Sequence, residues 1–355
     1  MKKKILILQG IIPSYREPIY NLLSKKYDLT VGYLLNTQVK SDFFTQKKIP
    51  YFKFFNLSLP TLNFFKELNK YEIIILTPDM HHINYCILPF IPLKPKIISW
   101  SIGMRASYKV IYDTNRGKTF LDFVYLFILR NCNANIFYYE GPFNFWKNLI
   151  NKKKVFIAFN TVNVLQSEIS NEKKKDILFL GSLINGKGVL DLIKIYISIV
   201  KSDKKFTPNL IIVGEGYLEN SIKILINKHN LSDRIIMFGG VYKELELSRI
   251  FKSIICCISP NQAGLSVLKC FGYGIPFITN VNAITGGEKD NIIHKVNGLL
   301  FSSFNELEEI LRQTQNNKSF FHELGANAKK YYNKNASIKK MGVGFENAIN
   351  YTLKK

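Results

Sequence analysis

The chain has 355 residues, 47% of them hydrophobic, and its mean hydropathy is +0.00. At roughly 150 residues a domain, this length predicts two or three domains with sizeable cores, which excludes a disordered or fibrous protein. The 49 basic residues outnumber the 26 acidic ones and give a net charge of +23, which favours a polyanionic partner or an anionic surface. Residues 1–160 hold 23 basic and 9 acidic side chains, so we expect the first half to face that surface more strongly.

The cysteines and the N-terminus indicate a cytoplasmic protein. The five cysteines show neither a zinc nor a redox spacing and lie mostly in apolar runs, so we expect reduced thiols in the core. The basic start and short apolar run at the N-terminus imitate a signal peptide, but the run is too short and is interpreted as a first strand. Apolar runs stay well below the ~18 residues that a membrane span needs, so we expect at most peripheral contact with the inner face of the cell membrane.

Short apolar runs alternate with amphipathic stretches of helix length, which is typical of parallel sheets built from βαβ units. Strands are predicted in the first half at 4–9, 29–35, 72–77, 96–100, 134–139 and 154–158. After a polar connection near 165–175, they are predicted at 176–181, 209–214, 234–239, 254–259 and 276–279. The predicted fold class is therefore α/β, with two doubly wound Rossmann-like domains whose parallel sheets face a central cleft. We expect the domains at 1–165 and 166–335, with a helix over 336–355 that packs back toward the first domain.

Polar side chains follow the predicted strand 72–77 of the first half. His81 and His82 stand at its end, and His82 is the candidate catalytic residue there, as a polar contact or a base. A purely structural histidine is the alternative. Asp79 and Arg16 are similar candidates.

The stretch 118–131 has helical length, an apolar and aromatic body, and basic residues at both ends. Its composition fits a buried helix or a helix lying in a membrane interface, and it favours burial over the interface. Basic clusters with interleaved aromatic residues occur elsewhere in the first half. A lipid-linked acceptor on an anionic membrane would explain both features, and a genome biased toward lysine codons is the other explanation.

Four features of the second half point to a phosphate-bearing ligand. In the first, a strand ends at Gly181 and a loop with Lys187 between two glycines opens a helix, so the backbone can approach an anion and a cation stands beside it. In the second, Gly214 and Gly216 follow a strand. The third glycine of a dinucleotide fingerprint is missing, so a tight turn explains this pair equally well.

The third feature is a loop from Pro260 that leads into a predicted helix start at Gly264 and Leu265. The free N–H groups of Ala263, Gly264 and Leu265 would form an anion site strengthened by the helix dipole. The fourth feature is Gly286-Gly287 followed by Glu288 and Asp290, with a hairpin-like Asn297-Gly298 beyond. A glycine pair beside acids can hold a sugar through its hydroxyl groups, and an ordinary helix start is the alternative.

The ordered series resembles the second domain of GT-B glycosyltransferases, namely the large retaining family four (glycosyl transferases group 1) of the bacterial polysaccharide-assembly type. The series consists of Gly181, Lys187-Gly188, Gly214 with Gly216, Phe238 with Gly239, Pro260, Gly264-Leu265, Gly274 with Pro276, Gly286-Gly287 and Asn297-Gly298. The resemblance implies transfer of a sugar from a UDP- or GDP-sugar, with retention and without a metal or other cofactor. It implies Lys187 and Glu288 as catalytic residues, and His82 of the first half is added to them from its position after a strand. The donor contacts it implies are Gly10, Gly181, Ser182, Gly214, Asn261, Ala263, Gly264, Leu265, Ser266 and Lys269.

The sequence departs from the family at three donor positions. The family's two glutamates are Asn261 and Lys269 here, and its arginine is Ser182. An amide can still bond to sugar hydroxyls, whereas an ammonium cannot accept a hydrogen bond from a ribose, and Lys269 could instead point to solvent. The expected acceptor is a glycan or a lipid-linked glycan of the cell surface. The alternatives are an inactive GT-B relative that binds or scaffolds, and a nucleic-acid-binding protein. We expect no nucleic-acid partner, because no recognition motif accompanies the charge.

Overall fold

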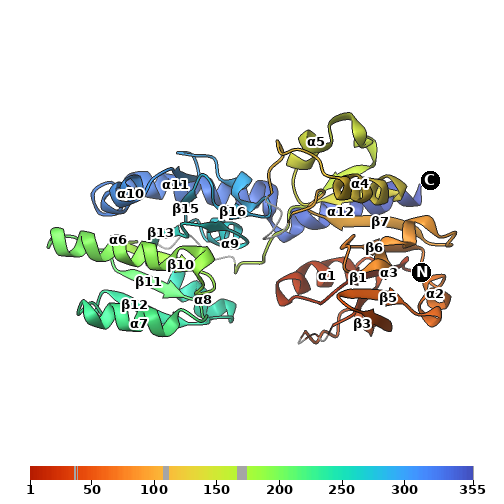
Figure 1. Ribbon diagram of the computed structural model, residues 1–355, viewed down its shortest axis with the longest axis horizontal. Helices are drawn as coiled ribbons and strands as arrows, with labels where there is room; N and C mark the ends of the chain where they lie inside the picture. Colours follow the sequence, from red (N-terminus) through yellow and green to blue (C-terminus); the bar gives the residue numbers. More distant parts are fainter. Residues whose placement is uncertain (36, 38, 107–111, 166–173, 355) are drawn as a thin grey trace. The chain divides into compact units, whose positions relative to one another are not determined.

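The computed structural model describes all residues except 36, 38, 107–111, 166–173 and 355. The chain divides into two compact units (Figure 1). Unit 1 comprises Met1–Val162 and Ala336–Lys355, and unit 2 comprises Asn163–Asn335. The boundary expected between residues 165 and 166 adjoins residues outside the described part, as does most of the polar connection near 165–175.

A seven-stranded parallel sheet forms the centre of unit 1, in the order β3-β2-β1-β6-β7-β8-β9. Its strands are β1 (Lys4–Gln9), β2 (Asp28–Tyr33), β3 (Thr45–Lys48), β6 (Ile73–Leu76), β7 (Lys96–Ser101), β8 (Ala134–Phe137) and β9 (Val155–Ile157). Except for β3, they coincide with the predicted strands. Helices cover both faces, so the central strands are buried on both sides and read as unbroken apolar runs.

Successive side chains of β1 enter two different cores of unit 1. Ile5 and Ile7 pack with α1 (Glu17–Ser24) and α12 (Ile338–Leu353), where Phe345 lies with its ring centroid 4.8 Å from that of Trp100. Leu6 and Leu8 pack with α2 (Leu62–Leu68) and α3 (Ile83–Cys86) on the other face. The C-terminal helix is therefore part of the core of unit 1.

The remaining elements of unit 1 surround this sheet. A third core lies between α4 (Phe120–Asn131) and α5 (Gly141–Trp146). The strands β4 (Tyr51–Phe54) and β5 (Leu57–Pro60) form an antiparallel hairpin. The short helices are η1 (Ser14–Arg16), η2 (Leu88–Phe90), η3 (Lys147–Leu149) and η4 (Lys152–Lys154).

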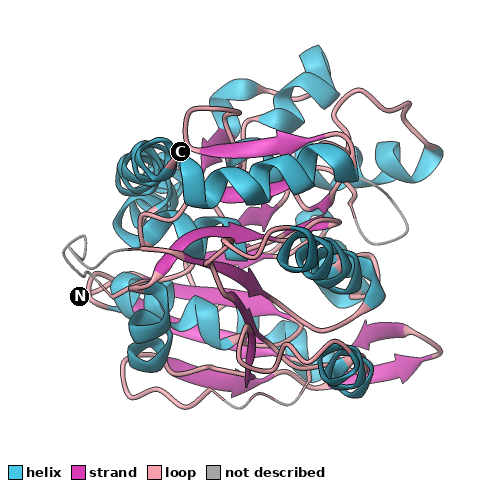
Figure 2. Ribbon diagram, turned by 90° about the vertical axis from the view of Figure 1, so that its left-hand side faces the viewer, coloured by secondary structure: helices cyan, strands magenta, loops and turns pink. Residues whose placement is uncertain are grey.

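Unit 2 is built around a six-stranded parallel sheet in the order β12-β11-β10-β13-β15-β17. The strands are β10 (Asp176–Leu180), β11 (Leu210–Val213), β12 (Ile235–Gly239), β13 (Ile254–Ile258), β15 (Phe277–Asn280) and β17 (Gly298–Phe301). The flanking helices are α6 (Val189–Ser202), α7 (Glu219–Lys228), α8 (Glu244–Phe251), α9 (Ser266–Gly272), α10 (Phe304–Asn316) and α11 (Lys318–Tyr331). Figure 2 shows helices on both sides of the strands.

Smaller elements join the ends of these strands. They are η5 (Asn185–Lys187), β14 (Gln262–Ala263), β16 (Ile284–Thr285), η6 (Glu288–Asn291) and a π turn, η7 (Tyr332–Ala336). The hairpin-like reading of Asn297-Gly298 is wrong. Gly298 begins β17, which pairs in parallel with β15, and a parallel neighbour cannot be reached through a two-residue hairpin.

Both sheets have the doubly wound strand order, so the predicted fold class of two Rossmann-like α/β domains is confirmed. In such sheets the order in which successive strands are added reverses between two central strands. Ligands bind beyond the carboxyl ends of those strands. The reversal lies between β1 and β6 in unit 1 and between β10 and β13 in unit 2. The loops after these four strands are therefore the first places to look for function.

The cysteines agree with the expectation from composition. The cysteines are unbonded and buried, as predicted. Among the helices in the described part of the chain, none is long and apolar enough to cross a membrane.

Candidate functional site

The loop after β10 places a lysine at the reversal point of unit 2. This loop runs from Gly181 through η5 to Gly188. Gly188 adopts a φ of +73° and directly precedes α6. A β-carbon added at Gly181 would lie 3.6 Å from the Lys187 Nζ, so this ammonium lies beside the end of β10. Burial lowers the pKa of Lys187, and the charge of Glu288 partly offsets the shift. The exposed Ser182 stands in the same loop.

The loop after β13 packs directly on the loop that carries Lys187. The Asn261 N–H donates to the Lys187 carbonyl oxygen over 3.3 Å. A β-carbon on Gly188 would lie only 2.9 Å from the Asn261 Cγ, so the turn can approach the amide this closely because position 188 is glycine. The Asn261 carbonyl accepts from the Ile284 N–H over 2.8 Å, which connects the same loop to β16.

The helix after this loop begins later than predicted. Ala263 belongs to β14, which pairs with β16, so the expectation that it lies at a helix start is wrong. A residue engaged in a strand pair does not present its N–H as a helix end does. The helix α9 begins at Ser266, and in its first turn the Val267 and Lys269 N–H groups already donate to the Gly264 and Leu265 carbonyl oxygens at 3.0 Å. Gly264 lies beside open space, because a β-carbon there would meet no atom within 4 Å.

Glu288 follows β16 and completes the group. Its side chain is buried, and its Oε2 accepts hydrogen bonds from the Gly286 N–H at 2.9 Å and the Thr285 hydroxyl at 3.3 Å. Gly287 adopts a φ of +113°, which favours glycine at the turn. The structure thus brings Gly181, Lys187, Asn261 and Glu288 together at the carboxyl ends of β10 and β13.

Lys269 lies on α9 and points to neither solvent nor an open space. Its Nζ forms an ion pair with the Glu244 carboxylate at 2.5 Å and donates to the Asn163 carbonyl at 2.9 Å. The Tyr273 hydroxyl donates to the other oxygen of Glu244 at 2.5 Å. This lysine therefore joins α9 to the start of α8, and its role as a donor contact stays a prediction.

Sequence analysis overlooked several polar side chains at the same edge of the sheet. Tyr242, after β12, donates a hydrogen bond to Glu215, after β11. Tyr217 accepts one from the Asn185 N–H over 3.0 Å. Both tyrosines are strongly exposed. The usable signal was a tyrosine in each of the loops that follow β11 and β12, where a core aromatic would be out of place.

The backbone of Gly214 contacts the backbone of the loop that carries Lys187. The Gly181 N–H donates to the Val213 carbonyl, and the Gly214 N–H donates to the Gly239 carbonyl. A β-carbon on Gly214 would lie 1.8 Å from the Gly181 carbonyl oxygen. Its requirement for glycine is therefore structural, and it aligns the ends of β10, β11 and β12.

In unit 1 the loops after β1 and β6 bring Gly10 and His82 together. A β-carbon on Gly10 would lie 2.6 Å from the His82 Nε2. The His82 Nδ1 lies 3.0 Å from the Ser58 hydroxyl, which donates to the side-chain amide oxygen of Asn84 over 3.1 Å. A Ser58 hydroxyl that donates to Asn84 is left to accept from the His82 Nδ1, and this arrangement favours the tautomer in which Nε2 is the acceptor beside Gly10. Burial lowers the pKa of His82, which favours its neutral imidazole.

The other candidates of unit 1 surround a pocket at the carboxyl edge of its sheet. The pocket has a volume of about 360 Å³, and its lining includes Asp79, His81, Arg105 and Tyr138. The exposed His81 lies 2.9 Å from the Asp79 carboxylate. Arg16 is buried, with its guanidinium carbon 4.2 Å from the centroid of Trp100, and donates to Gln9 and Tyr138. Arg16 thereby connects the ends of β1 and β8.

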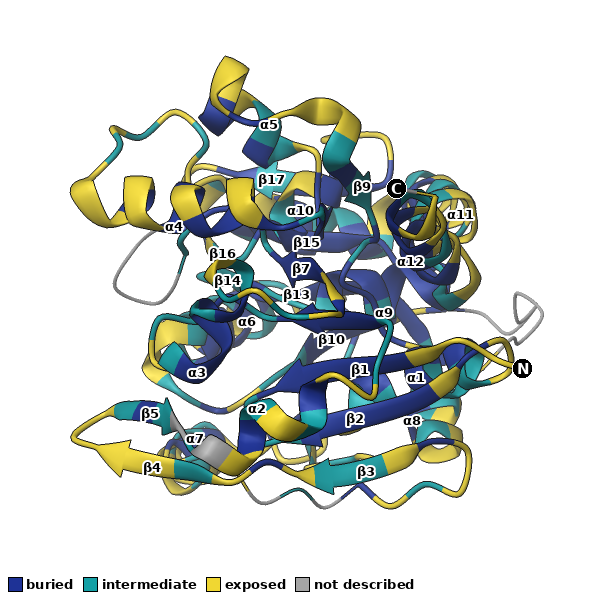
Figure 3. Cartoon of the chain, turned by 90° about the vertical axis from the view of Figure 1, so that its right-hand side faces the viewer, coloured by how far each residue is buried: buried dark blue, intermediate teal, exposed yellow. Residues whose placement is uncertain are grey.

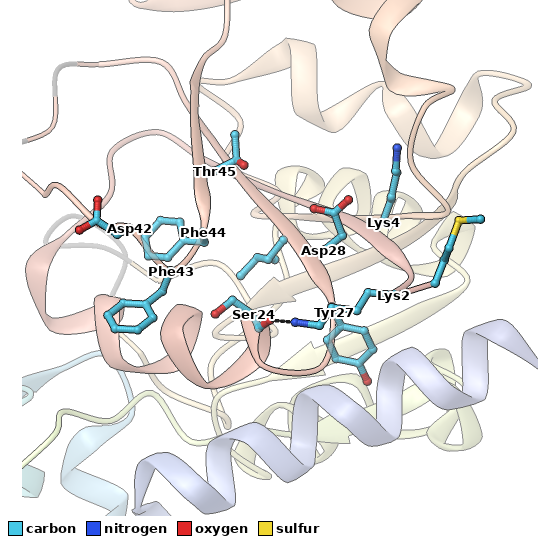
Figure 4. A pocket seen from close by; sticks show the side chains of 11 residues that line it. Lys2, Lys4, Ser24, Tyr27, Asp28, Asp42, Phe43, Phe44 and Thr45 are labelled. Carbon is cyan, nitrogen blue, oxygen red and sulfur yellow. Dashed lines mark hydrogen bonds between the residues drawn. The ribbon is translucent and has the colours of Figure 1, made fainter.

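A second hollow of about 530 Å³ lies at the opposite edge of the same sheet (Figure 4). Its lining comes from the amino ends of β1 and β2, and the Lys2 ammonium there donates to the Ser24 carbonyl at 2.9 Å. Ligands of doubly wound sheets bind at the carboxyl ends of the strands, so this hollow is not assigned to the site. In the described residues, no three His, Cys, Asp or Glu side chains are grouped so that they could hold a metal ion.

Comparison with known proteins agrees with this geometry. Residues 163–331, nearly the whole of unit 2, match the model of the family Glycosyl transferases group 1. Among curated proteins, none matches the sequence.

Solved glycosyltransferase structures share the fold of the whole chain at low sequence identity. HepE of Anabaena in complex with UDP matches with 14% identity and a TM-score of 0.70, over 98% of this chain and 99% of that one. Sucrose-phosphate synthase of Thermosynechococcus elongatus matches with 14% identity and a TM-score of 0.69, over 99% and 100%. WaaG, a glycosyltransferase involved in lipopolysaccharide biosynthesis, matches with 14% identity and a TM-score of 0.62, over 97% and 98%. At these identities the likeness establishes a shared GT-B fold.

Proposed function

We propose that the protein transfers a sugar from a nucleotide-sugar donor, with retention and without a metal, to a glycan or lipid-linked acceptor of a cell-surface polysaccharide. The observation that carries the proposal is the position of Lys187, whose ammonium lies beside Gly181 at the reversal point of unit 2. Asn261, Glu288 and the first turn of α9 adjoin it. A cation beside a glycine turn and the start of a helix suits a diphosphate.

Each of these groups has a role in the proposed transfer. The Lys187 ammonium and the N–H groups at the start of α9 stabilise the negative charge that develops on the departing diphosphate. The Asn261 amide hydrogen-bonds to hydroxyls of the donor sugar, and Glu288 positions the same sugar. The exposed Ser182 contacts the diphosphate through its hydroxyl.

The donor and acceptor are proposed from the relatives and from unit 1. A UDP-sugar is the first candidate, because HepE was solved with UDP, and a GDP-sugar is the second. The pocket of about 360 Å³ at the carboxyl edge of unit 1 suits an acceptor sugar. A cytoplasmic enzyme that meets its acceptor at the inner face of the cell membrane fits the involvement of WaaG in lipopolysaccharide biosynthesis.

His82 serves this reaction as a neutral imidazole that hydrogen-bonds to a substrate hydroxyl from the Gly10 side. Since burial lowers its pKa, we expect the acidic limb of the kcat/KM profile to lie below the value of about 6.5 usual for histidine. Protonation below that point removes the acceptor at Nε2, so activity falls as the pH falls. The measurement is the pH dependence of donor turnover in the wild type and in His82→Asn. An acidic limb that the substitution leaves unchanged would assign the titration to another group.

A donor panel tests the proposed function. We expect nucleoside diphosphate release from UDP- or GDP-sugars in the presence of bacterial membrane extract, and none from ADP-sugars or, scored as CMP, from CMP-sugars. Chelation of divalent cations is expected to leave the rate unchanged. The anomeric configuration of the product, read by NMR, is expected to match that of the donor.

The outcomes of the panel separate the competing functions. If no donor of the panel releases its nucleotide and no nucleotide shifts the melting temperature, the transferase is contradicted and an inactive relative is favoured. The changed positions Ser182 and Lys269 would then be the evidence for lost donor binding. Donor binding without transfer would identify a binding protein. Nucleic-acid affinity that falls steeply with salt, with no response to nucleotide sugars, would identify the third alternative.

A further inference from the structure

The outer face of α4 is apolar and exposed. Its inner residues pack into the core, whereas Phe120 and Phe127 on the outer face are 80% and 60% exposed. The ring of Phe90, from η2, stacks on that of Phe127 with their centroids 4.9 Å apart. We call this surface the α4 patch; it comprises Phe90, Phe120, Leu121, Phe123, Val124 and Phe127 (Figure 3). A contiguous apolar surface of this kind marks an interaction site.

Positive charge accompanies the α4 patch. At the C-terminal end of α4 a pocket of about 340 Å³ contains Arg130 and Lys154 among its lining residues, together with three asparagines and Leu149. No carboxylate belongs to that lining. Residues 88–154 contain 11 basic and three acidic side chains. Of the acidic ones, Asp122 is neutralised by Arg116 at 2.7 Å. The segment that carries the α4 patch is therefore strongly basic in sequence.

We propose that the α4 patch and the pocket of Arg130 and Lys154 dock unit 1 on an anionic lipid surface. The phenylalanine rings enter the boundary between headgroups and acyl chains, and the two cations meet lipid phosphates. A second copy of the chain fits less well, because a symmetric contact would bring two basic rims together. This inference names a partner of the proposed transferase. The docking is argued from the surface itself, and only its link to a lipid-linked acceptor rests on the proposed function.

The same helix connects the lipid surface to the acceptor pocket. Tyr125, on the inner face of α4, lines the pocket at the carboxyl edge of the sheet, and its hydroxyl donates to the Ser101 hydroxyl over 2.8 Å. The two faces of one helix thus contact the bilayer and the pocket. A lipid-linked acceptor could keep its tail in the bilayer and present its polar head to this pocket.

Vesicle sedimentation of the full chain tests the docking. We expect binding to vesicles of phosphatidylcholine mixed with phosphatidylglycerol, weaker binding to phosphatidylcholine alone, and a decline with salt. The double variant Phe120→Ser/Phe127→Ser is expected to lower the partition coefficient at least about tenfold for each ring removed from the lipid. Arg130→Gln/Lys154→Gln is expected to lower it about fivefold for each charge. Melting temperatures confirm that each variant folds.

Matched control variants distinguish binding through the α4 patch from non-specific binding of the protein to vesicles. Ile224→Ser/Val343→Ser removes two exposed apolar side chains elsewhere, and Lys204→Gln/Lys205→Gln removes two exposed charges of unit 2. Both controls are expected to bind vesicles like the wild type. The proposal is overturned if the wild type ignores anionic vesicles, if the controls lose as much binding as the α4 variants, or if the α4 substitutions only dissociate a dimer. Donor turnover without acceptor is expected to persist in the α4 variants, so the two proposals fail independently.

Discussion

Lys187→Ala is expected to lower kcat/KM for the donor about 10²- to 10³-fold, the range found when one donor to a developing oxyanion is removed. The half-buried ammonium lies beside Gly181, where low polarity strengthens its attraction for a diphosphate. The diphosphate gains negative charge as it departs. The loss should therefore appear more in kcat than in KM. Steady-state kinetics with the responsive donor measure it.

The stability of Lys187→Ala should change little, which makes the kinetic result interpretable. Burial lowers the pKa of this lysine, so the folded state disfavours its charged form instead of relying on it. Lys204→Ala is the matched control, because it removes the same charge from an exposed position of unit 2. Unchanged turnover together with unchanged donor affinity in Lys187→Ala would remove this residue from the mechanism.

Much of the fold could be predicted because buried parallel strands are recognisable as unbroken apolar runs. The runs at 4–9 and 176–181 became β1 and β10, next to the two reversal points. The order of glycines then indicated Lys187 and Glu288, since a loop that lets backbone approach an anion needs glycine there. The short strand β14 was missed. Its partner β16 lies some twenty residues further on, and two residues carry no periodicity.

The side-chain partners of the candidate site could not be predicted, because they are tertiary. Lys269 pairs with Glu244, which comes from a different helix and lies 25 residues away in sequence. The role of α4 was open for another reason. Apolar residues occupy nearly its whole circumference, so periodicity alone did not separate the face that Tyr125 buries from the face that Phe120 exposes.

Gly214→Ala is expected to destabilise the protein by about 3 to 5 kcal/mol, because a strained backbone and an overpacked contact add at one position. The residue has a φ of +150°, and its new β-carbon would lie 1.8 Å from the Gly181 carbonyl oxygen. That oxygen belongs to the backbone and cannot rotate away. Relief requires the ends of β10 and β11 to separate. For a unit of this size the loss corresponds to a melting temperature lower by about 10 °C.

Gly186→Ala is the matched control for this substitution. Both glycines stand in loops at the carboxyl edge of unit 2, and a sequence alone gives no reason to rank them. A β-carbon at position 186 would meet no atom within 4 Å, and Gly186 is not among the glycines with positive φ. We expect its melting temperature to stay within about 1 °C of the wild type, because such surface changes are usually near neutral. Equal melting temperatures for the two variants would contradict the close approach of Gly214 to Gly181, on which the alignment of the lysine loop depends.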